Sequence, residues 1–339
     1  MKSSSPPEPR ETTRVFADNR LLPILFGEHH AHLSELESAL GVSILAHGNE
    51  VKIRGPDEAR TAAAQVLDDL YARIGRGQMI DSGDVVGAAR LASAVPKSEA
   101  APPPGDPAYH VRTWRKLIAP RTPAQAKYIE AIRNNELVFG LGPAGTGKTY
   151  LAVACAVSLL YQGQVERLIL SRPAVEAGER LGFLPGDMRE KVDPYLQPLY
   201  DALHDMMPGE QVRRRMESGE IEIAPLAFMR GRTLSSAFVI LDEAQNTSPM
   251  QMKMFLTRLG PKSRMVVTGD PSQVDLPAHA PSGLREAETI LKGVQGLAFV
   301  RFDETDVVRH TLVARIVKAY NAHDAKLSKP KSRGAEDKS

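Results

Sequence analysis

The sequence predicts an α/β domain built on a parallel sheet, preceded by a smaller α+β unit. Two observations carry this prediction. Beyond residue 109, short apolar or β-branched runs alternate with helical patterns, and such spacing implies crossover connections between parallel strands. An earlier region repeats the signals of strands and helices on a smaller scale, and a core-poor stretch separates the two. With 339 residues, 42% of them hydrophobic, the chain has enough material for both parts.

Five segments follow from this pattern. Residues 1–13, rich in Ser, Pro and charge, are predicted as a disordered tail. The small α+β unit is expected at 14–75 and a linker at 76–108. The α/β domain is expected at 109–323. Residues 324–339 are polar and rich in lysine, so we expect a disordered end there rather than a binding arm.

The expected elements of the small unit are a helix at 32–40, strands at 42–45 and 51–53, and a helix at 56–74. A Gly-Asn pair between the two strands provides the turn. The linker has few large apolar residues and carries three consecutive prolines, so it is predicted to be extended. Six strands are then expected in the larger domain, at residues 137–141, 168–171, 221–224, 238–241, 265–268 and 297–302.

Composition excludes several classes of protein. The single cysteine, Cys155, rules out an intramolecular disulfide and a cysteine-rich metal site. Lysine and arginine number 43 against 41 acidic residues, so the overall charge does not by itself indicate a nucleic-acid partner. Charged residues interrupt every apolar run that is long enough to cross a membrane, and the start of the chain lacks a signal-peptide pattern. We therefore expect a cytoplasmic protein without a membrane partner.

The most specific motif is a glycine-rich loop between the 137–141 strand and a helix beginning near Tyr150. Glycines let the backbone fold around a phosphate with its N–H groups turned inward, and the helix N-terminus adds partial positive charge. Lys148 is placed to bind the terminal phosphates, and the Thr149 hydroxyl to ligate Mg²⁺. The predicted nucleotide site comprises Gly142, Pro143, Ala144, Gly145, Thr146, Gly147, Lys148 and Thr149.

Two carboxylates end the buried 238–241 strand. Asp242 is predicted to hold magnesium, and Glu243 to polarise the attacking water. A helix N-cap explains Asp242 alone but not Glu243. The pair favours a hydrolase over a phosphotransferase, since an enzyme with a bound acceptor needs no base for water. Gln273, in the turn after the 265–268 strand, is suited to sense the γ-phosphate, although a plain turn glutamine fits the spacing equally well.

These residues resemble the PhoH-like ATPases, whose nucleotide site is similar to one core domain of the superfamily 1 helicases. The resemblance runs from residue 109 to about 320 and implies a P-loop NTPase (RecA/helicase-like) fold that uses ATP and Mg²⁺. Its most specific parts are Ser171-Arg172-Pro173-Ala174-Val175-Glu176-Ala177-Gly178-Glu179, Gly182-Phe183-Leu184-Pro185-Gly186-Asp187 and Met229-Arg230-Gly231-Arg232-Thr233. Two further segments also look like that family, Leu241-Asp242-Glu243-Ala244-Gln245-Asn246 and Met254-Phe255-Leu256-Thr257-Arg258-Leu259-Gly260.

The resemblance implies roles for four further residues. Gln125 looks like the helicase glutamine that reads adenine, which favours ATP over GTP. Arg172, Arg230 and Arg232 look like contacts to single-stranded RNA, and structural ion pairs are the alternative for each.

The first unit resembles a KH-like RNA-binding module. A KH domain clamps nucleic acid with a G-x-x-G loop. This chain instead has Gly27-Glu28-His29-His30, so docking of a partner or a neighbouring subunit is the alternative use. A basic stretch at 112–116 offers a second RNA surface, in which Trp114 is either a stacking platform or a core anchor.

The chain also lacks the second nucleotide-binding core of a helicase, which supplies an arginine to the γ-phosphate. We therefore predict a homo-oligomeric ring, a hexamer, with Arg309 or Arg258 as the arginine from the neighbouring subunit. The resemblance implies an RNA-dependent ATPase or RNA helicase acting in RNA processing, with an rRNA-maturation endoribonuclease as partner. The alternative is a nucleotide-controlled assembly or chaperone module whose hydrolysis is independent of RNA.

Overall fold

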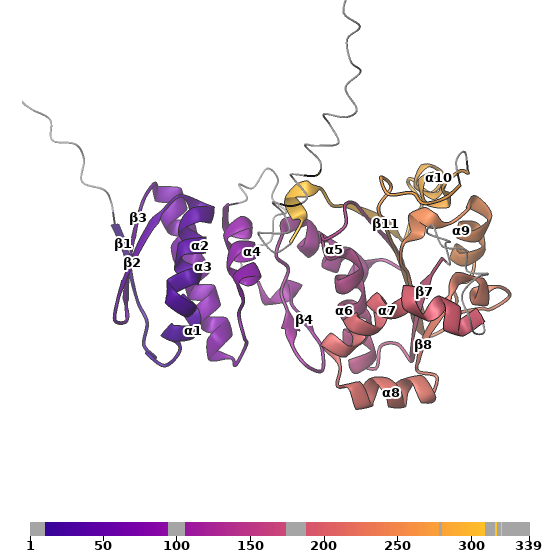
Figure 1. Ribbon diagram of the computed structural model, residues 1–339, viewed down its shortest axis with the longest axis horizontal. Coiled ribbons are helices and arrows are strands. Elements are labelled where there is room, and N and C mark those ends of the chain that lie inside the picture. The colour runs from indigo at the N-terminus through magenta and orange to yellow at the C-terminus, as the bar shows by residue number, and fades with distance from the viewer. Residues whose placement is uncertain are drawn as a thin grey trace, which may run out of the picture. The chain divides into compact units, whose positions relative to one another are not determined.

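The computed structural model describes residues 11–93, 106–173, 188–277 and 280–308, together with positions 316 and 320 (Figure 1). The chain divides into a compact unit, Met1–Val307, and a second unit, Val308–Ser339. The small α+β unit and all six strands predicted for the larger domain lie in the first unit. In the described ranges, no helix combines the length and the apolar character that crossing a membrane requires.

The small α+β unit is an antiparallel sheet covered by helices. Its sheet has the order β1-β3-β2. Val51 and Ile53 of the central strand are fully buried against the helices, whereas the outer strands alternate between covered and exposed residues. The elements are β1 (Glu11–Val15), α1 (Leu22–Phe26), α2 (Ala31–Leu40), β2 (Ser43–His47), β3 (Glu50–Arg54), α3 (Asp57–Gly75) and α4 (Ser82–Ser93).

Two predicted boundaries of this unit are wrong. The tail predicted at 1–13 overlaps a strand, because Glu11–Val15 forms β1 and pairs with β3, and residues 1–10 lie outside the described residues. The linker predicted at 76–108 contains α4, which packs on α2 and α3 and buries Val85, Ala88 and Ala89 in their core. Helices rich in small residues pack closely without large side chains, and the lack of large apolar residues therefore misled the prediction. The triple proline at 102–104 lies outside the described residues.

The larger part is a six-stranded sheet with helices on both faces. The order is β11-β6-β10-β9-β7-β8, and every pairing is parallel, as the alternating pattern predicted. In the described residues, four of the five connections between consecutive strands contain an α-helix. The strands are β6 (Leu137–Leu141), β7 (Arg167–Arg172), β8 (Ile221–Pro225), β9 (Ala237–Leu241), β10 (Arg264–Gly269) and β11 (Leu297–Arg301).

Strand residues alternate between the two helical layers. Phe238 and Ile240 pack in one core with α5 (Pro123–Asn134), α6 (Lys148–Tyr161) and α7 (Met188–Met206). Val239 and Leu241 pack in the other core, with α9 (Pro249–Leu256) and α10 (Gly283–Ile290). Both faces of the sheet are covered, which explains why its strands read as continuous apolar runs. The remaining elements are α8 (Gly209–Glu217) and a small hairpin of β4 (Val111–Arg112) and β5 (Leu117–Ile118).

The strand order brings the predicted motifs together. β10 lies between β6, which precedes the glycine-rich loop, and β9, which precedes the two acids. Because the strands are parallel, their carboxyl ends meet at one edge of the sheet. The site therefore spans three neighbouring strand ends.

Candidate functional site

The glycine-rich loop leaves β6 and ends at α6, as the sequence predicted. Gly142 has a φ of 146° and Gly147 a φ of 82°, both in the region that favours glycine. A Cβ at Gly142 would lie 2.8 Å from the Phe302 Cβ and overlap the Phe302 carbonyl oxygen. Only glycine therefore allows the loop to close against residue 302.

The Lys148 ammonium lies inside this loop. Its Nζ donates to the carbonyl oxygens of Gly142 at 2.7 Å and Pro143 at 2.6 Å, and lies 3.3 Å from the Thr146 hydroxyl oxygen. Lys148 is only 8% exposed. A positive charge is thus held at the start of α6, where the helix N-terminus also favours anions.

Asp242 joins the loop to the strand ends. Its Oδ1 accepts hydrogen bonds from the hydroxyls of Thr149 at 2.6 Å and Thr268 at 2.7 Å. Asp242 is 4% exposed, so these partners compensate a buried carboxylate. The three side chains come from α6, β9 and β10, in line with the sequence prediction that placed Thr149 and Asp242 at one site.

This donor set fits Mg²⁺. A hydroxyl and a carboxylate are the hard oxygen ligands that Mg²⁺ prefers, and the ion usually takes one or two carboxylates together with water and substrate phosphates. Among the described residues, no group of three or more His, Cys, Asp or Glu side chains forms a dedicated metal site. The protein would therefore hold magnesium through Thr149 and Asp242 together with a nucleotide.

Glu243 follows Asp242 in a left-handed conformation, with φ 54° and ψ 37°. Such a conformation is costly for a residue with a side chain and is found most often at functional sites. The Glu243 side chain is 43% exposed, in contrast to that of Asp242. The turn thus buries the first carboxylate and presents the second one outward, which agrees with separate roles for the two acids.

Arg172 bridges the two acids. Its Nε lies 3.1 Å from Asp242 Oδ2, and its Nη2 lies 3.0 Å from Glu243 Oε1. The remaining nitrogen, Nη1, donates to the Tyr195 carbonyl oxygen at 2.7 Å. In this conformation all three guanidinium nitrogens contact the protein. These contacts agree with the alternative role of Arg172 as a structural ion-pair residue rather than an RNA contact.

Gln245 is a site residue to which sequence reasoning assigned no role. Its Nε2 donates to Glu243 Oε2, and its Oε1 accepts the backbone N–H of Asp270 at 3.0 Å. Gln245 is 1% exposed, so both ends of its amide are committed. The sequence feature that could have identified Gln245 is its position two residues after the acid pair, where it is a polar residue in a buried turn.

Gln125 lies beside the glycine-rich loop. Its Nε2 donates to the Thr146 carbonyl oxygen at 3.0 Å, and its Oε1 accepts the Arg121 backbone N–H at 2.6 Å. The residue is 4% exposed, and its own N–H bonds to the Thr122 hydroxyl that caps α5. The structure therefore brings Gln125 to the phosphate loop.

Gln273 follows β10 in the turn that begins at Asp270. Its backbone N–H donates to the Asp270 carbonyl oxygen at 3.1 Å, and its side chain is exposed. The turn is closed by Ser272, which donates to Asp270 Oδ1 from both its N–H and its hydroxyl. Gln273 thus lies at the expected strand end, between the loop and the acids.

The predicted arginines divide into two groups. Arg232 forms two hydrogen bonds with Glu222, at 2.7 and 2.6 Å, whereas Arg230 is exposed. Arg258 donates to the carbonyl oxygens of Met254 at 3.0 Å and Arg232 at 3.1 Å. A role for Arg258 in a neighbouring subunit would require it to leave these bonds. Arg309 and the family motif at 174–187 lie outside the described residues.

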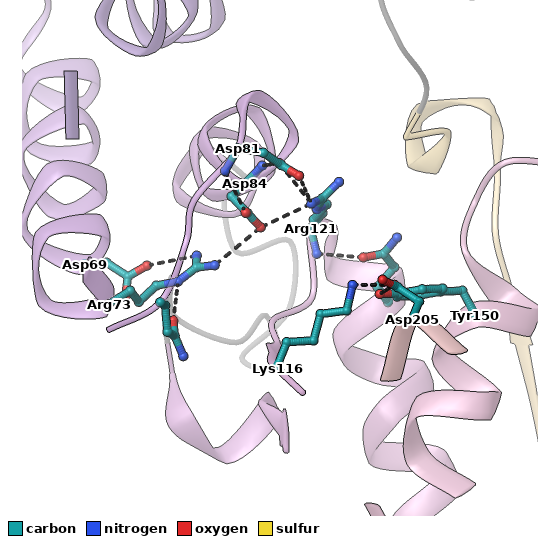
Figure 2. Close-up of polar contacts among 10 residues, drawn as sticks. Asp69, Arg73, Asp81, Asp84, Lys116, Arg121, Tyr150 and Asp205 are labelled. Carbon is teal, nitrogen blue, oxygen red and sulfur yellow. Dashed lines mark hydrogen bonds and ion pairs between the residues drawn. The ribbon is translucent and has the colours of Figure 1, made fainter. Parts of the chain in front are cut away.

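Trp114 is partly buried against the sheet core. Its ring meets Tyr161 edge to face at 4.8 Å, and the Arg215 guanidinium lies 5.0 Å from its centroid. Neighbouring Lys116 pairs with Asp205, which also accepts a hydrogen bond from Tyr150 at 2.7 Å (Figure 2). These contacts are those of the core-anchor alternative.

The parallel sheet, the phosphate loop and the paired acids together define a nucleotide-binding P-loop NTPase. Comparison with known families agrees, since residues 117–321 match the model of the family described as "PhoH-like protein". The chain belongs to this PhoH-like family.

Relatives and solved structures were also found. A PhoH-like protein of Bacillus subtilis (strain 168) is 51% identical over 301 residues, covering 88% of this chain and 93% of the relative. A PhoH-like protein of Mycobacterium tuberculosis (strain ATCC 25618 / H37Rv) is 49% identical over 300 residues, covering 88% and 85%. The Pif1 helicase of Candida albicans aligns over 62% of this chain and 48% of its own, at 13% identity and a TM-score of 0.31.

Proposed function

We propose that this protein binds ATP with Mg²⁺ and hydrolyses it, and that single-stranded RNA raises the rate. The proposal of an ATPase rests on one observation. Four predicted site residues lie just beyond the ends of β6 and β9, namely Lys148, Thr149, Asp242 and Glu243. Hydroxyl, carboxylate and ammonium groups meet there within hydrogen-bond distance of one another or of the loop backbone.

Each residue has a role that its position allows. Lys148 binds and neutralises the terminal phosphates, which positions the reacting group. Glu243, the more exposed acid, orients a water and accepts its proton as the γ-phosphoryl group passes to the water oxygen, giving ADP and phosphate. Magnesium supplies charge neutralisation on the phosphate oxygens when it is bound through Thr149 and Asp242.

Adenine selectivity is assigned to Gln125. A buried amide that must pair both its donor and its acceptor discriminates against a base with the opposite pattern, because a mismatch leaves polar groups unpaired. Gln125 lies against the loop, where Arg121 and Thr146 take one lone pair and one N–H of its amide, so that the second lone pair and the second N–H are left for a base. Adenine is the base we expect, and Gln273 is the residue expected to sense the γ-phosphate.

The RNA part of the proposal rests on the small N-terminal unit and on Arg230. The order β1, α1, α2, β2, β3, α3 includes the two helices and two strands expected for this unit, and residues 27–30 lie between α1 and α2. His29 and His30 have φ values of 50° and 61° there, so this turn is tight even without a second glycine. Arg230 adds an exposed cation on the larger domain.

Turnover with and without RNA tests this function. Steady-state ATP hydrolysis is measured with a single-stranded oligouridine RNA and with a DNA of equal length and sequence type. A several-fold rise with RNA supports the proposal of an RNA-dependent ATPase. Unwinding assays and a search for an rRNA-maturation endoribonuclease as a cytoplasmic partner would then follow. If hydrolysis occurs but RNA leaves the rate unchanged, the RNA-independent assembly or chaperone function takes its place.

A ring is the proposed assembly, because hydrolysis of this type uses an arginine that stabilises the charge on the γ-phosphate in the transition state. We assign this role to Arg309 or Arg258 of a neighbouring subunit in a hexamer. Mixing Arg309→Ala chains with Lys148→Ala chains tests it, because mixed rings combine an intact loop with an intact arginine. Partial recovery of hydrolysis supports a shared site, and no recovery rejects Arg309.

A further inference from the structure

Helix α4 forms a close seat for Arg121, the residue just before α5. Gly83 and Gly87 lie one turn apart on α4. A Cβ at Gly87 would approach the Cβ of Arg121 to 2.6 Å and its Cα to 2.8 Å, and a Cβ at Gly83 would overlap the guanidinium. The contact at Gly87 is with the backbone and Cβ of Arg121, which cannot give way, so a glycine is needed there. At Gly83 the nearest atoms are the far end of the Arg121 side chain, which can shift. The backbone position of Arg121 is therefore set by a helix of the small unit.

Charges reinforce this seat. Arg121 Nη2 lies 3.0 and 2.9 Å from the two carboxylate oxygens of Asp81 and 3.4 Å from Asp84 Oδ1 (Figure 2). Asp84 also pairs with Arg73 at 3.3 Å, which extends the chain of charges to α3. Burial acts to raise the pKa of Asp81, but Arg121 and the hydrogen bonds from Asp84 lower it overall. The carboxylate form is thus the one that this contact favours.

Arg121 connects this seat to the nucleotide site. Its backbone N–H donates to Gln125 Oε1 at 2.6 Å, and Gln125 Nε2 donates to the Thr146 carbonyl oxygen at 3.0 Å. Both polar ends of the Gln125 amide are committed, so displacement of residue 121 changes the orientation of the amide beside the loop. Two hydrogen bonds therefore separate α4-bound Arg121 from the phosphate loop.

A second connection runs from the same helix. Arg90, near the end of α4, donates to the carbonyl oxygens of Thr305 at 3.1 Å and Val307 at 3.4 Å. A few residues earlier, the Phe302 N–H donates to the Leu141 carbonyl oxygen at 2.7 Å, just before the loop begins. Helix α4 thus contacts both segments that border the glycine-rich loop.

We propose that Arg121 is a positioning residue that acts through Gln125, and that α4 makes the small N-terminal unit part of the base selectivity of the ATP site. The proposal rests on the adenine-reading role given to Gln125 above. Its consequence is that changes on α4, remote from the phosphates, alter the KM for ATP and the preference for ATP over GTP. They leave kcat unchanged, because the reacting groups near Glu243 are untouched.

Kinetics on ATP and GTP with the full chain test this proposal. The variants are Arg121→Ala, Asp81→Asn and Gln125→Ala, with Arg14→Ala as the matched control. Arg14 forms an ion pair with Asp68 at 3.0 Å within the small unit. Asp81→Asn keeps the shape of the side chain and a carbonyl acceptor for α4, so folding is preserved, and circular dichroism verifies it.

We expect a loss of about threefold to tenfold in the ATP/GTP ratio of kcat/KM for Arg121→Ala and Asp81→Asn, through KM. This is the scale of one weakened hydrogen bond. Gln125→Ala loses at least as much, and Arg14→Ala loses none. A readout in KM with kcat intact separates positioning from a general loss of folded protein.

The contrary outcomes are distinct. If Gln125→Ala loses selectivity while Arg121→Ala and Asp81→Asn keep the wild-type KM and ratio, the coupling is wrong and the α4 contact is structural only. If the wild type does not prefer ATP and Gln125→Ala changes nothing, the adenine-reading role fails and the coupling falls with it. If Arg14→Ala shifts the ratio as much as Asp81→Asn does, selectivity does not depend on α4 and the proposal is overturned.

Discussion

Two arginines of this protein each lie between a pair of carboxylates. Arg172 bridges Asp242 and Glu243 at the edge of the sheet, with a side chain 17% exposed. Arg121 contacts Asp81 and the neighbouring acid of α4, with a side chain 31% exposed. By sequence alone, each arginine is a cation with a choice of acids. The structure shows that the two groups differ in what else the acids touch.

At the sheet edge, Asp242 also accepts hydrogen bonds from the hydroxyls of Thr149 and Thr268, and Thr149 belongs to the glycine-rich loop. At the start of α4, Asp81, which directly precedes the helix, and Asp84 of its first turn contact arginines and each other's backbone N–H groups. One set of carboxylates therefore also bonds to the proposed nucleotide site, whereas the other joins two parts of the chain. Two similar arginine–carboxylate groups can therefore have different roles, depending on which other residues the carboxylates contact.

The largest expected effect is at Glu243, and it tests whether the sheet-edge group is catalytic. Glu243→Gln removes the proton acceptor but keeps the shape, so kcat for ATP should fall by about 10²-fold to 10⁴-fold with nucleotide binding retained. Glu220→Gln is the matched control, because Glu220 is 42% exposed and also pairs with an arginine. Comparable losses in both variants would remove the distinction between the two carboxylates.

A second prediction concerns His110, which lines a pocket with Arg73, Asp84 and Arg121. Burial, and then the charge of Arg73, lower the pKa of His110 from 6.5 to about 4. Unfolded chains therefore bind a proton between these values while the folded protein does not. Stability is consequently lost as the pH falls below about 6.5, by up to roughly 3 kcal/mol near pH 4.

His110→Gln should remove that part of the acid sensitivity, since glutamine does not titrate. Urea unfolding at pH 7.5 and pH 5, followed by circular dichroism, measures it for wild type and variant. The variant should lose less stability between the two pH values than the wild type. Equal losses would mean that His110 is not the group that destabilises the α4 region in acid.

The third prediction separates the two proposed uses of Arg172. Arg172→Ala should lower ATP turnover about 10-fold to 100-fold even without RNA, because hydrogen bonds to charged groups contribute about 1.5–3 kcal/mol and the Asp242 and Glu243 carboxylates lose theirs. Arg230→Ala, at an exposed position, should leave turnover without RNA unchanged and weaken stimulation by RNA. The reverse pattern would place Arg172 on the RNA and not on the acids.

The smallest expected effect is the stability change in Asp81→Asn. Asp81 is 65% exposed, so the ion pair with Arg121 contributes less than about 1 kcal/mol. Because the pKa of Asp81 is lowered, this contribution is present at neutral pH and is lost as the pH falls and the carboxyl protonates. Urea unfolding at pH 7 measures it. A loss of several kcal/mol would show that the α4 contact is a core element rather than a positioning device.

Local patterns explain how much of the site was predictable. The strand at 137–141 was predicted with its observed bounds, because strand, loop and helix signals follow each other within 25 residues. Asp242 and Glu243 could also be located from the local pattern, because they directly follow a run of buried strand residues. Helix α4 was missed because four of its five buried positions are Gly, Ala or Val, and so many small residues are also typical of a linker.

By itself, the sequence determined the parallel α/β class, the phosphate loop and the two acids, since each depends on the order of nearby residues. Only the tertiary structure decided the partners of the arginines. Arg121 and Asp81 are 40 positions apart in the sequence, and Arg172 and Asp242 are 70 positions apart. Contacts of that range depend on how helices and strands pack, and on whether a glycine allows close approach, which no local pattern records. The same reason explains why Gln125, to which the resemblance gives an adenine-reading role, could be identified from the sequence, while its connection to α4 through Arg121 could not.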